Sequence, residues 1–157
     1  GHSAGGQFVC RFVLQHPDRV RAAVLSAPGR YAFPDPNAPW PYGMGRFERT
    51  LHWGGSGPNA RKREIVKPDP RSFLRAATKP IAVVVGGRDL EPQPRRPAHH
   101  GANRIELARQ WVREMNALAK SHDEKSRLRG MIVPKIGHNS RQLTPHCQKM
   151  FERLVAE

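Results

Sequence analysis

The first five residues of the chain carry the pattern that is best suited to chemistry. Gly1, His2, Ser3, Ala4 and Gly5 follow the spacing Gly-x-Ser-x-Gly, which places a serine in a tight turn between a strand and a helix. Small neighbours favour such a turn because larger side chains would collide with the backbone. A glycine-rich turn that leads into a helix also suits a phosphate group. Taken alone, the pattern leaves a nucleophilic serine and a phosphate site open.

Two further residues would activate such a serine. Its hydroxyl is a poor nucleophile until an imidazole accepts the proton, and a carboxylate must fix the tautomer of that imidazole. Asp89 follows the apolar run 81–85, and His138 follows the run 131–133. Both runs have the composition of buried parallel strands, so we expect both side chains at the carboxyl edge of one sheet, where the serine turn also lies. The rival acid is Glu91, and the rival bases, none of which directly follows a strand, are His99, His100 and His146.

Hydrophobic periodicity predicts the elements that would position these residues. Apolar residues at helical spacing behind Ser3 predict a helix that Pro17 ends. The run 20–27 indicates a buried strand, while the spacings over 108–120 and around 150–155 are helical. The order of helix, strand, insertion, strand, helix, strand and helix predicts an α/β fold with a parallel sheet and flanking helices.

The segment 28–69 has a different character. It is dense in proline and glycine and holds six of the eleven aromatic residues. A structureless loop of this length is uncommon in a compact domain, so we expect an insertion with short elements of its own, such as a lid. Its aromatic residues form either a hydrophobic cluster or the wall of a substrate pocket, for which Trp40 and Trp53 are the candidates.

Composition and charge exclude several classes of protein. The 157 residues form one domain, and the net charge is +14. The basic residues are scattered apart from clusters at 61–63 and 95–96, and no helix-turn-helix, RNP-type or finger pattern accompanies them, so we expect no nucleic-acid partner. No apolar run approaches the ~18 residues of a membrane span. Cys10, Cys147 and the histidines lack metal-ligand spacing, so no metal is expected. A serine that is activated by an imidazole and a carboxylate requires no organic cofactor either.

Several motifs together resemble the C-terminal half of an α/β-hydrolase. The chain order of serine, aspartate and histidine is also that of this superfamily. Within it, the sequence is most similar to bacterial esterases, polyhydroxybutyrate depolymerases and feruloyl esterases. The resemblance implies that Ser3 is the nucleophile, Asp89 the acid, His138 the base, and the Ala4 N–H one oxyanion donor. The motifs that carry it are Gly1-His2-Ser3-Ala4-Gly5-Gly6, His16-Pro17-Asp18-Arg19-Val20, Lys79-Pro80-Ile81 with Gly86-Gly87-Arg88-Asp89, and Val133-Pro134-Lys135-Ile136-Gly137-His138.

The activity implied by this resemblance is that of a serine hydrolase that cleaves a small-molecule or polymeric carboxylic ester through an acyl-enzyme. Thioesters and amides stay open as substrates, because the three catalytic groups do not select the leaving group. The chain opens within the serine motif, so we expect the N-terminal half of the fold, with the second oxyanion donor and any signal peptide, to be missing and the 157 residues alone to be inactive. Two other classes stay open. They are a non-catalytic binding protein on the same scaffold and a basic module for nucleic acid or anionic surfaces.

Overall fold

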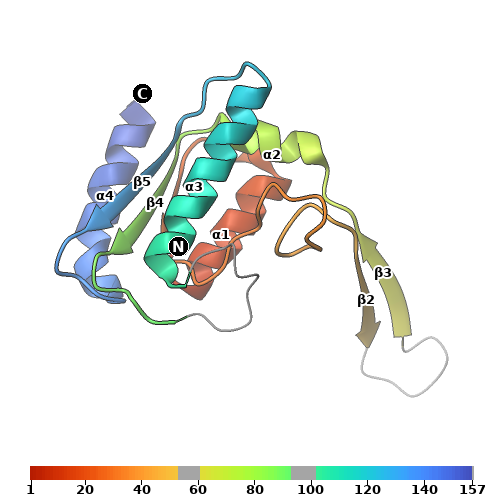
Figure 1. Ribbon diagram of the computed structural model, residues 1–157, viewed down its shortest axis with the longest axis horizontal. Helices are drawn as coiled ribbons and strands as arrows, with labels where there is room; N and C mark the ends of the chain where they lie inside the picture. Colours follow the sequence, from red (N-terminus) through yellow and green to blue (C-terminus); the bar gives the residue numbers. More distant parts are fainter. Residues whose placement is uncertain (53–60, 93–101, 157) are drawn as a thin grey trace.

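A three-stranded parallel sheet with helices on both faces forms the body of the protein (Figure 1). The computed structural model describes residues 1–52, 61–92 and 102–156. The strand order is β1-β4-β5, so β4 lies in the centre. The predicted α/β fold with a parallel sheet is confirmed. The strands are β1 (Ala23–Ser26), β4 (Ile81–Gly86) and β5 (Leu128–Val133), and the helices are α1 (Ala4–Gln15), α2 (Pro70–Ala77), α3 (Arg104–Ser121) and α4 (Ser140–Ala156).

The strands lie close to where the apolar runs predict them. Every residue of β4 is buried, as expected for the central strand of a sheet that is covered on both faces. Ile81 of β4 pairs with Ala23 on one side and with Leu128 on the other, so the three strands are in register. The predicted strand 20–27 is shorter in the structure, because a 3-10 turn at Pro17–Arg19 and the residues after it lead up to β1.

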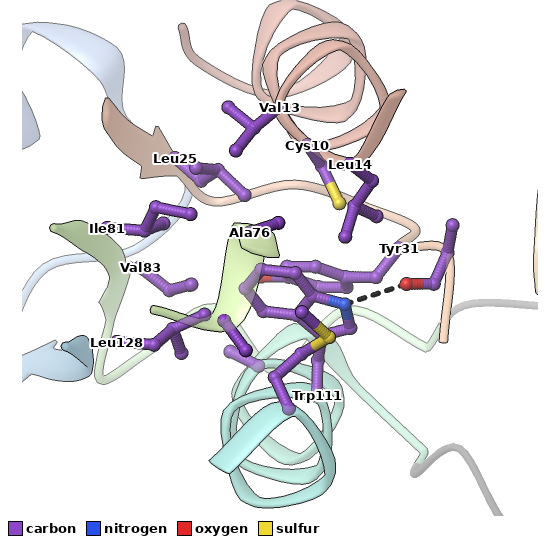
Figure 2. Packing of buried hydrophobic residues seen from close by; sticks show 14 of the residues in the cluster. Cys10, Val13, Leu14, Leu25, Tyr31, Ala76, Ile81, Val83, Trp111 and Leu128 are labelled. Atoms are coloured by element: carbon purple, nitrogen blue, oxygen red, sulfur yellow. Dashed lines mark hydrogen bonds between the residues drawn. The ribbon is translucent and has the colours of Figure 1, made fainter. Parts of the chain in front are cut away.

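The main hydrophobic core lies between the sheet and helices α1, α2 and α3, while α4 covers the opposite face. Trp111 of α3 is at its centre, and its indole N–H donates a 2.8 Å hydrogen bond to the Ala32 carbonyl (Figure 2). The ring of Tyr31 stacks on Trp111 with 5.1 Å between centroids. Tyr31, Ala32 and Phe33 are all buried here, so the start of the 28–69 segment packs within the main core.

The later part of 28–69 forms an antiparallel ribbon of β2 (Phe47–His52) and β3 (Arg61–Val66) that projects from the body (Figure 1). Exposed ion pairs cross it, with 2.6 Å between Arg49 and Glu64. A second pair joins Arg63 to Glu48, and this hydrogen bond lowers the pKa of the Glu48 carboxyl. Each of the two strands has six residues, which is an ordinary strand length.

Two helix starts differ from the prediction. Helix α2 was not predicted at all, although Asp69 caps it by accepting a 2.9 Å hydrogen bond from the Arg71 N–H. Helix α3 begins at Arg104, four residues before the predicted start, because the Asn103 side chain accepts hydrogen bonds from two amides of its first turn.

No helix in the described ranges is long and apolar enough to cross a membrane.

Candidate active site

Ser3 stands in a strained turn directly before α1. Its φ of 51° and ψ of −116° lie in a region that costs a residue with a side chain roughly 1–3 kcal/mol, so the surrounding structure must hold it there. Two backbone hydrogen bonds do so, from the Ser3 N–H to the Ser26 carbonyl and from the Ser26 N–H to the Gly1 carbonyl, each 2.8 Å long. These bonds fix the serine turn to the carboxyl end of β1.

The glycine that opens the motif is required by space. A Cβ on Gly1 would lie 2.4 Å from the Gly5 carbonyl oxygen, a distance that no real side chain tolerates. The serine turn therefore closes only because Gly1 has no side chain. Ala4 is the first residue of α1, so its N–H has no acceptor within the helix.

Asp89 and His138 meet on two loops that are joined by their backbones. The Gly87 N–H donates to the Val133 carbonyl at 2.7 Å, and the Arg88 N–H donates to the Ile136 carbonyl at 2.8 Å. Across this junction, Oδ2 of Asp89 lies 2.8 Å from Nδ1 of His138. The Asp89 side chain is fully buried, whereas 29% of the His138 side chain is exposed.

The contact fixes the tautomer of His138. An ionised carboxylate can only accept hydrogen bonds, so the proton of the ring sits on Nδ1. Nε2 then carries a lone pair and is able to accept a proton from a hydroxyl group. This is the orientation that a general base of an acyl-transfer reaction needs.

His2 connects the imidazole to the serine turn. Its ring lies against the ring of His138, with 4.8 Å between centroids, and its Nδ1 is 2.9 Å from the Ser26 hydroxyl. Burial lowers the pKa of His2, and the neighbouring His138 lowers it further. Within the described residues, the Ser3 hydroxyl makes no hydrogen bond with His138, a bond that is commonly long or poorly aligned in the absence of substrate.

Arg104 is a site residue that the sequence analysis missed. Its Nη1 donates to Oδ1 of Asp89 at 2.9 Å and to Oε2 of Glu91 at 2.7 Å. Glu91, the rival acid, therefore contacts the guanidinium, and the imidazole hydrogen-bonds to Asp89. The sequence does contain one signal for Arg104. Asn103 followed by Glu106 is a pattern typical of a helix start, and it places Arg104 in the first turn of the helix. The helix dipole disfavours a cation there, so an arginine in this position indicates a nearby acidic partner.

The aromatic candidate Trp40 lies away from the serine turn. Trp40 lines a cavity of about 810 Å³ together with Gln15, which lies at the other end of α1 from Ser3. Trp53, His99 and His100 lie outside the described residues, and His146 is on α4.

A second cavity, of about 600 Å³, lies beside His2 between α1 and α4 and is lined largely by apolar side chains such as Phe12 and Phe151.

Comparisons with known proteins agree with this architecture. A family model described as alpha/beta hydrolase fold matches residues 1–78. No curated protein matches the sequence significantly.

Within the described parts of the chain, no three His, Cys, Asp or Glu side chains are grouped in a way that could hold a metal ion.

Two solved structures are similar over nearly the whole chain. One is poly(aspartic acid) hydrolase-1 from Sphingomonas sp. KT-1, which is 26% identical with a TM-score of 0.76, over 97% of this chain and 53% of that one. The other is a poly(3-hydroxybutyrate) depolymerase from Bordetella parapertussis, which is 24% identical with a TM-score of 0.74, over 96% of this chain and 47% of that one. The chain thus spans about half the length of each. Together with the parallel sheet and the family model, these likenesses establish that the chain has the alpha/beta hydrolase fold.

Proposed function

We propose that the protein is a serine hydrolase that cleaves carboxylic esters through an acyl-enzyme. The observation that carries the proposal is the 2.8 Å contact between Asp89 Oδ2 and His138 Nδ1, made by a fully buried carboxylate at the edge of the sheet where Ser3 occupies its strained turn. A serine, an oriented imidazole and a carboxylate are the three groups that acyl transfer requires.

In this reaction the Ser3 hydroxyl attacks the ester carbonyl while Nε2 of His138 takes its proton. The N–H of Ala4 donates a hydrogen bond to the oxyanion that forms. His138 then returns the proton to the leaving alcohol, and the acyl group stays on Ser3. Water repeats the sequence to release the acid, and Asp89 holds the imidazole in one tautomer throughout.

The proposed substrate class is supported by the names of the two similar structures, a poly(aspartic acid) hydrolase and a poly(3-hydroxybutyrate) depolymerase. Both names describe polymers of carboxylic-acid units, which are joined by amide bonds in the first and by ester bonds in the second. We propose a polymeric or small-molecule ester, as in the second. The Ser-His-Asp chemistry itself needs neither a metal ion nor an organic cofactor.

A fluorophosphonate probe tests the proposal, because it reacts covalently only with an activated serine. We expect the full-length protein to be labelled and to hydrolyse p-nitrophenyl esters. Ser3→Ala should abolish labelling and lower turnover by about 10⁶-fold, whereas Ser121→Ala, at an exposed serine of α3, should change neither. Labelling that persists in Ser3→Ala would exclude Ser3 as the nucleophile. An unlabelled wild-type protein would favour a non-catalytic binding protein on this scaffold.

A further inference from the structure

The carboxylate of Asp89 is held from two sides. One oxygen faces His138, and the other accepts a hydrogen bond from Arg104, which also binds Glu91 through the same nitrogen. The Asp89 side chain is fully buried and only 11% of the Arg104 side chain is exposed. The Glu91 side chain is 66% exposed. The contacts between Glu91, Arg104, Asp89 and His138 therefore lead from the solvent to the imidazole.

Arg104 occupies a position that is unfavourable for a cation by itself. It is the first residue of α3, where the unpaired N–H groups of the helix produce a positive potential. Burial alone would lower the pKa of Arg104, but hydrogen bonds to Glu91 and to Asp89 raise it overall above its usual value. The two carboxylates therefore hold the guanidinium in place, and its charge in turn offsets the cost of burying Asp89.

We propose that Arg104 is a positioning residue that keeps His138 in its neutral, proton-accepting form down to lower pH than the Asp89 contact alone would allow. This inference rests on the proposed function of His138 as the base. A carboxylate with no other partner would strongly favour the imidazolium form of a contacting histidine. Arg104 neutralises part of that negative charge, and its own charge opposes a second cation nearby.

The groups around His138 support this assignment. Asp89 contacts the ring from the loop after β4, His2 from the turn before α1, and Arg104 stands behind Asp89 at the start of α3. Because the pKa of His2 is lowered by burial, His2 adds little positive charge at neutral pH. Among the described residues, Arg104 and Asp89 are the buried charged side chains next to His138, and Glu91 contacts Arg104 from the surface.

Two measurements test the proposal. The first is the pH midpoint at which the His138 ring signals titrate by NMR, and the second is the acidic limb of kcat/KM for ester hydrolysis. In Arg104→Gln we expect both to move to higher pH by roughly one unit, because a unit charge is removed from a largely buried position nearby. Arg104→Lys keeps the charge and should leave the midpoint within about 0.3 units. Arg109→Gln, which removes an exposed charge from the same helix, is the matched control and should move neither measurement.

An unmoved midpoint in folded Arg104→Gln, or an equal shift in Arg104→Lys and Arg104→Gln, overturns the proposal. If Arg104→Gln does not fold, Glu91→Lys is the second test, since the Glu91 side chain is exposed. At low salt we expect this variant to move the pH midpoint of the His138 ring to lower pH by a few tenths of a unit. An unmoved midpoint is contrary to the proposal. The NMR readout needs no activity. A wild-type protein that fails to react with the fluorophosphonate, but whose His138 responds as described, would refute the proposed function and leave the role of Arg104 standing.

Discussion

The amide of Arg88 donates a 2.8 Å hydrogen bond to the carbonyl of Ile136, which joins the loop that carries Asp89 to the loop that carries His138. The two loops come this close because Gly86 has no side chain. A Cβ on Gly86 would lie 2.4 Å from the carbonyl oxygens of both Ile136 and Gly137. The geometry of the contact between Asp89 and His138 thus depends on a glycine that contacts neither side chain through a side chain of its own.

We therefore expect Gly86→Ala to separate the two loops. Forcing backbone apart in a packed region costs roughly 1–3 kcal/mol of stability, and the altered geometry should lower turnover in addition. The matched control is Gly130→Ala in β5, where the nearest atom to a new Cβ is a methyl group of Val112 at an ordinary 3.6 Å. Thermal unfolding and ester hydrolysis measure both variants. Equal behaviour of the two alanine variants would show that the close approach of the two loops does not require a glycine at position 86.

Replacing Asp89 tests which carboxylate serves as the acid. Asp89→Asn should lower turnover by about 10⁴-fold, because an amide in that position favours the wrong tautomer of His138. Glu91→Gln should cost less than about tenfold, since within the described part of the chain Glu91 contacts Arg104 and not His138. Steady-state kinetics with circular dichroism as the folding control provide the measurement. A larger loss in Glu91→Gln than in Asp89→Asn would reverse the assignment of the acid.

His2 makes stability depend on pH. Its pKa is lowered in the folded protein from an unfolded value of 6.5 by burial and by the adjacent His138. Between the folded and unfolded values the unfolded chain binds more protons, so stability is lost as the pH falls through about 6.5. We expect the melting temperature to fall less in His2→Gln than in wild type between about pH 7 and pH 5. His122→Gln, at an exposed histidine, should keep the wild-type pH dependence, and an unchanged slope in His2→Gln would contradict the prediction.

Trp40 offers a test of the aromatic segment. It is half-buried against the main core and shares its cavity with Gln15, so its loss should reduce packing and leave the serine environment intact. We expect Trp40→Ala to lower the melting temperature while the ranking of short-chain against long-chain esters stays the same. Tyr42→Ala, at a more exposed ring of the same segment, is the comparison. A changed ranking in Trp40→Ala would place this tryptophan in the substrate wall after all.

The parts of the fold that were predictable are those in which one physical signal dominates. The apolar run of β4 has no polar residue and is buried throughout, so its sequence admits few other structures. The proximity of Asp89 to His138 also followed from the sequence, because each comes shortly after a parallel strand and such strands end at the same edge. The details of both loops did not follow, since their closeness depends on Gly86.

Other features were missed because their signals are local and short. Helix α2 has eight residues, and only its Asp69 cap and the proline after it mark the start. Arg104 is one of many arginines in a basic chain. It belongs to the site because it forms ion pairs with Asp89 and Glu91, which are distant from it in sequence. Buried ion pairs of this kind depend on tertiary structure, so neither composition nor periodicity reveals them.

Trp111 gives α3 a second attachment, two turns after Arg104, through its hydrogen bond to the Ala32 carbonyl (Figure 2). Helix α3 thus begins at the ion pair between Arg104 and Asp89 and is anchored in the core through Trp111. An evolutionary change that re-aims Arg104 must also disturb the packing of Trp111. Substitutions therefore disturb the fold least in segments without such an anchor. We expect the sequence of α3 to be among the last parts of this scaffold to change.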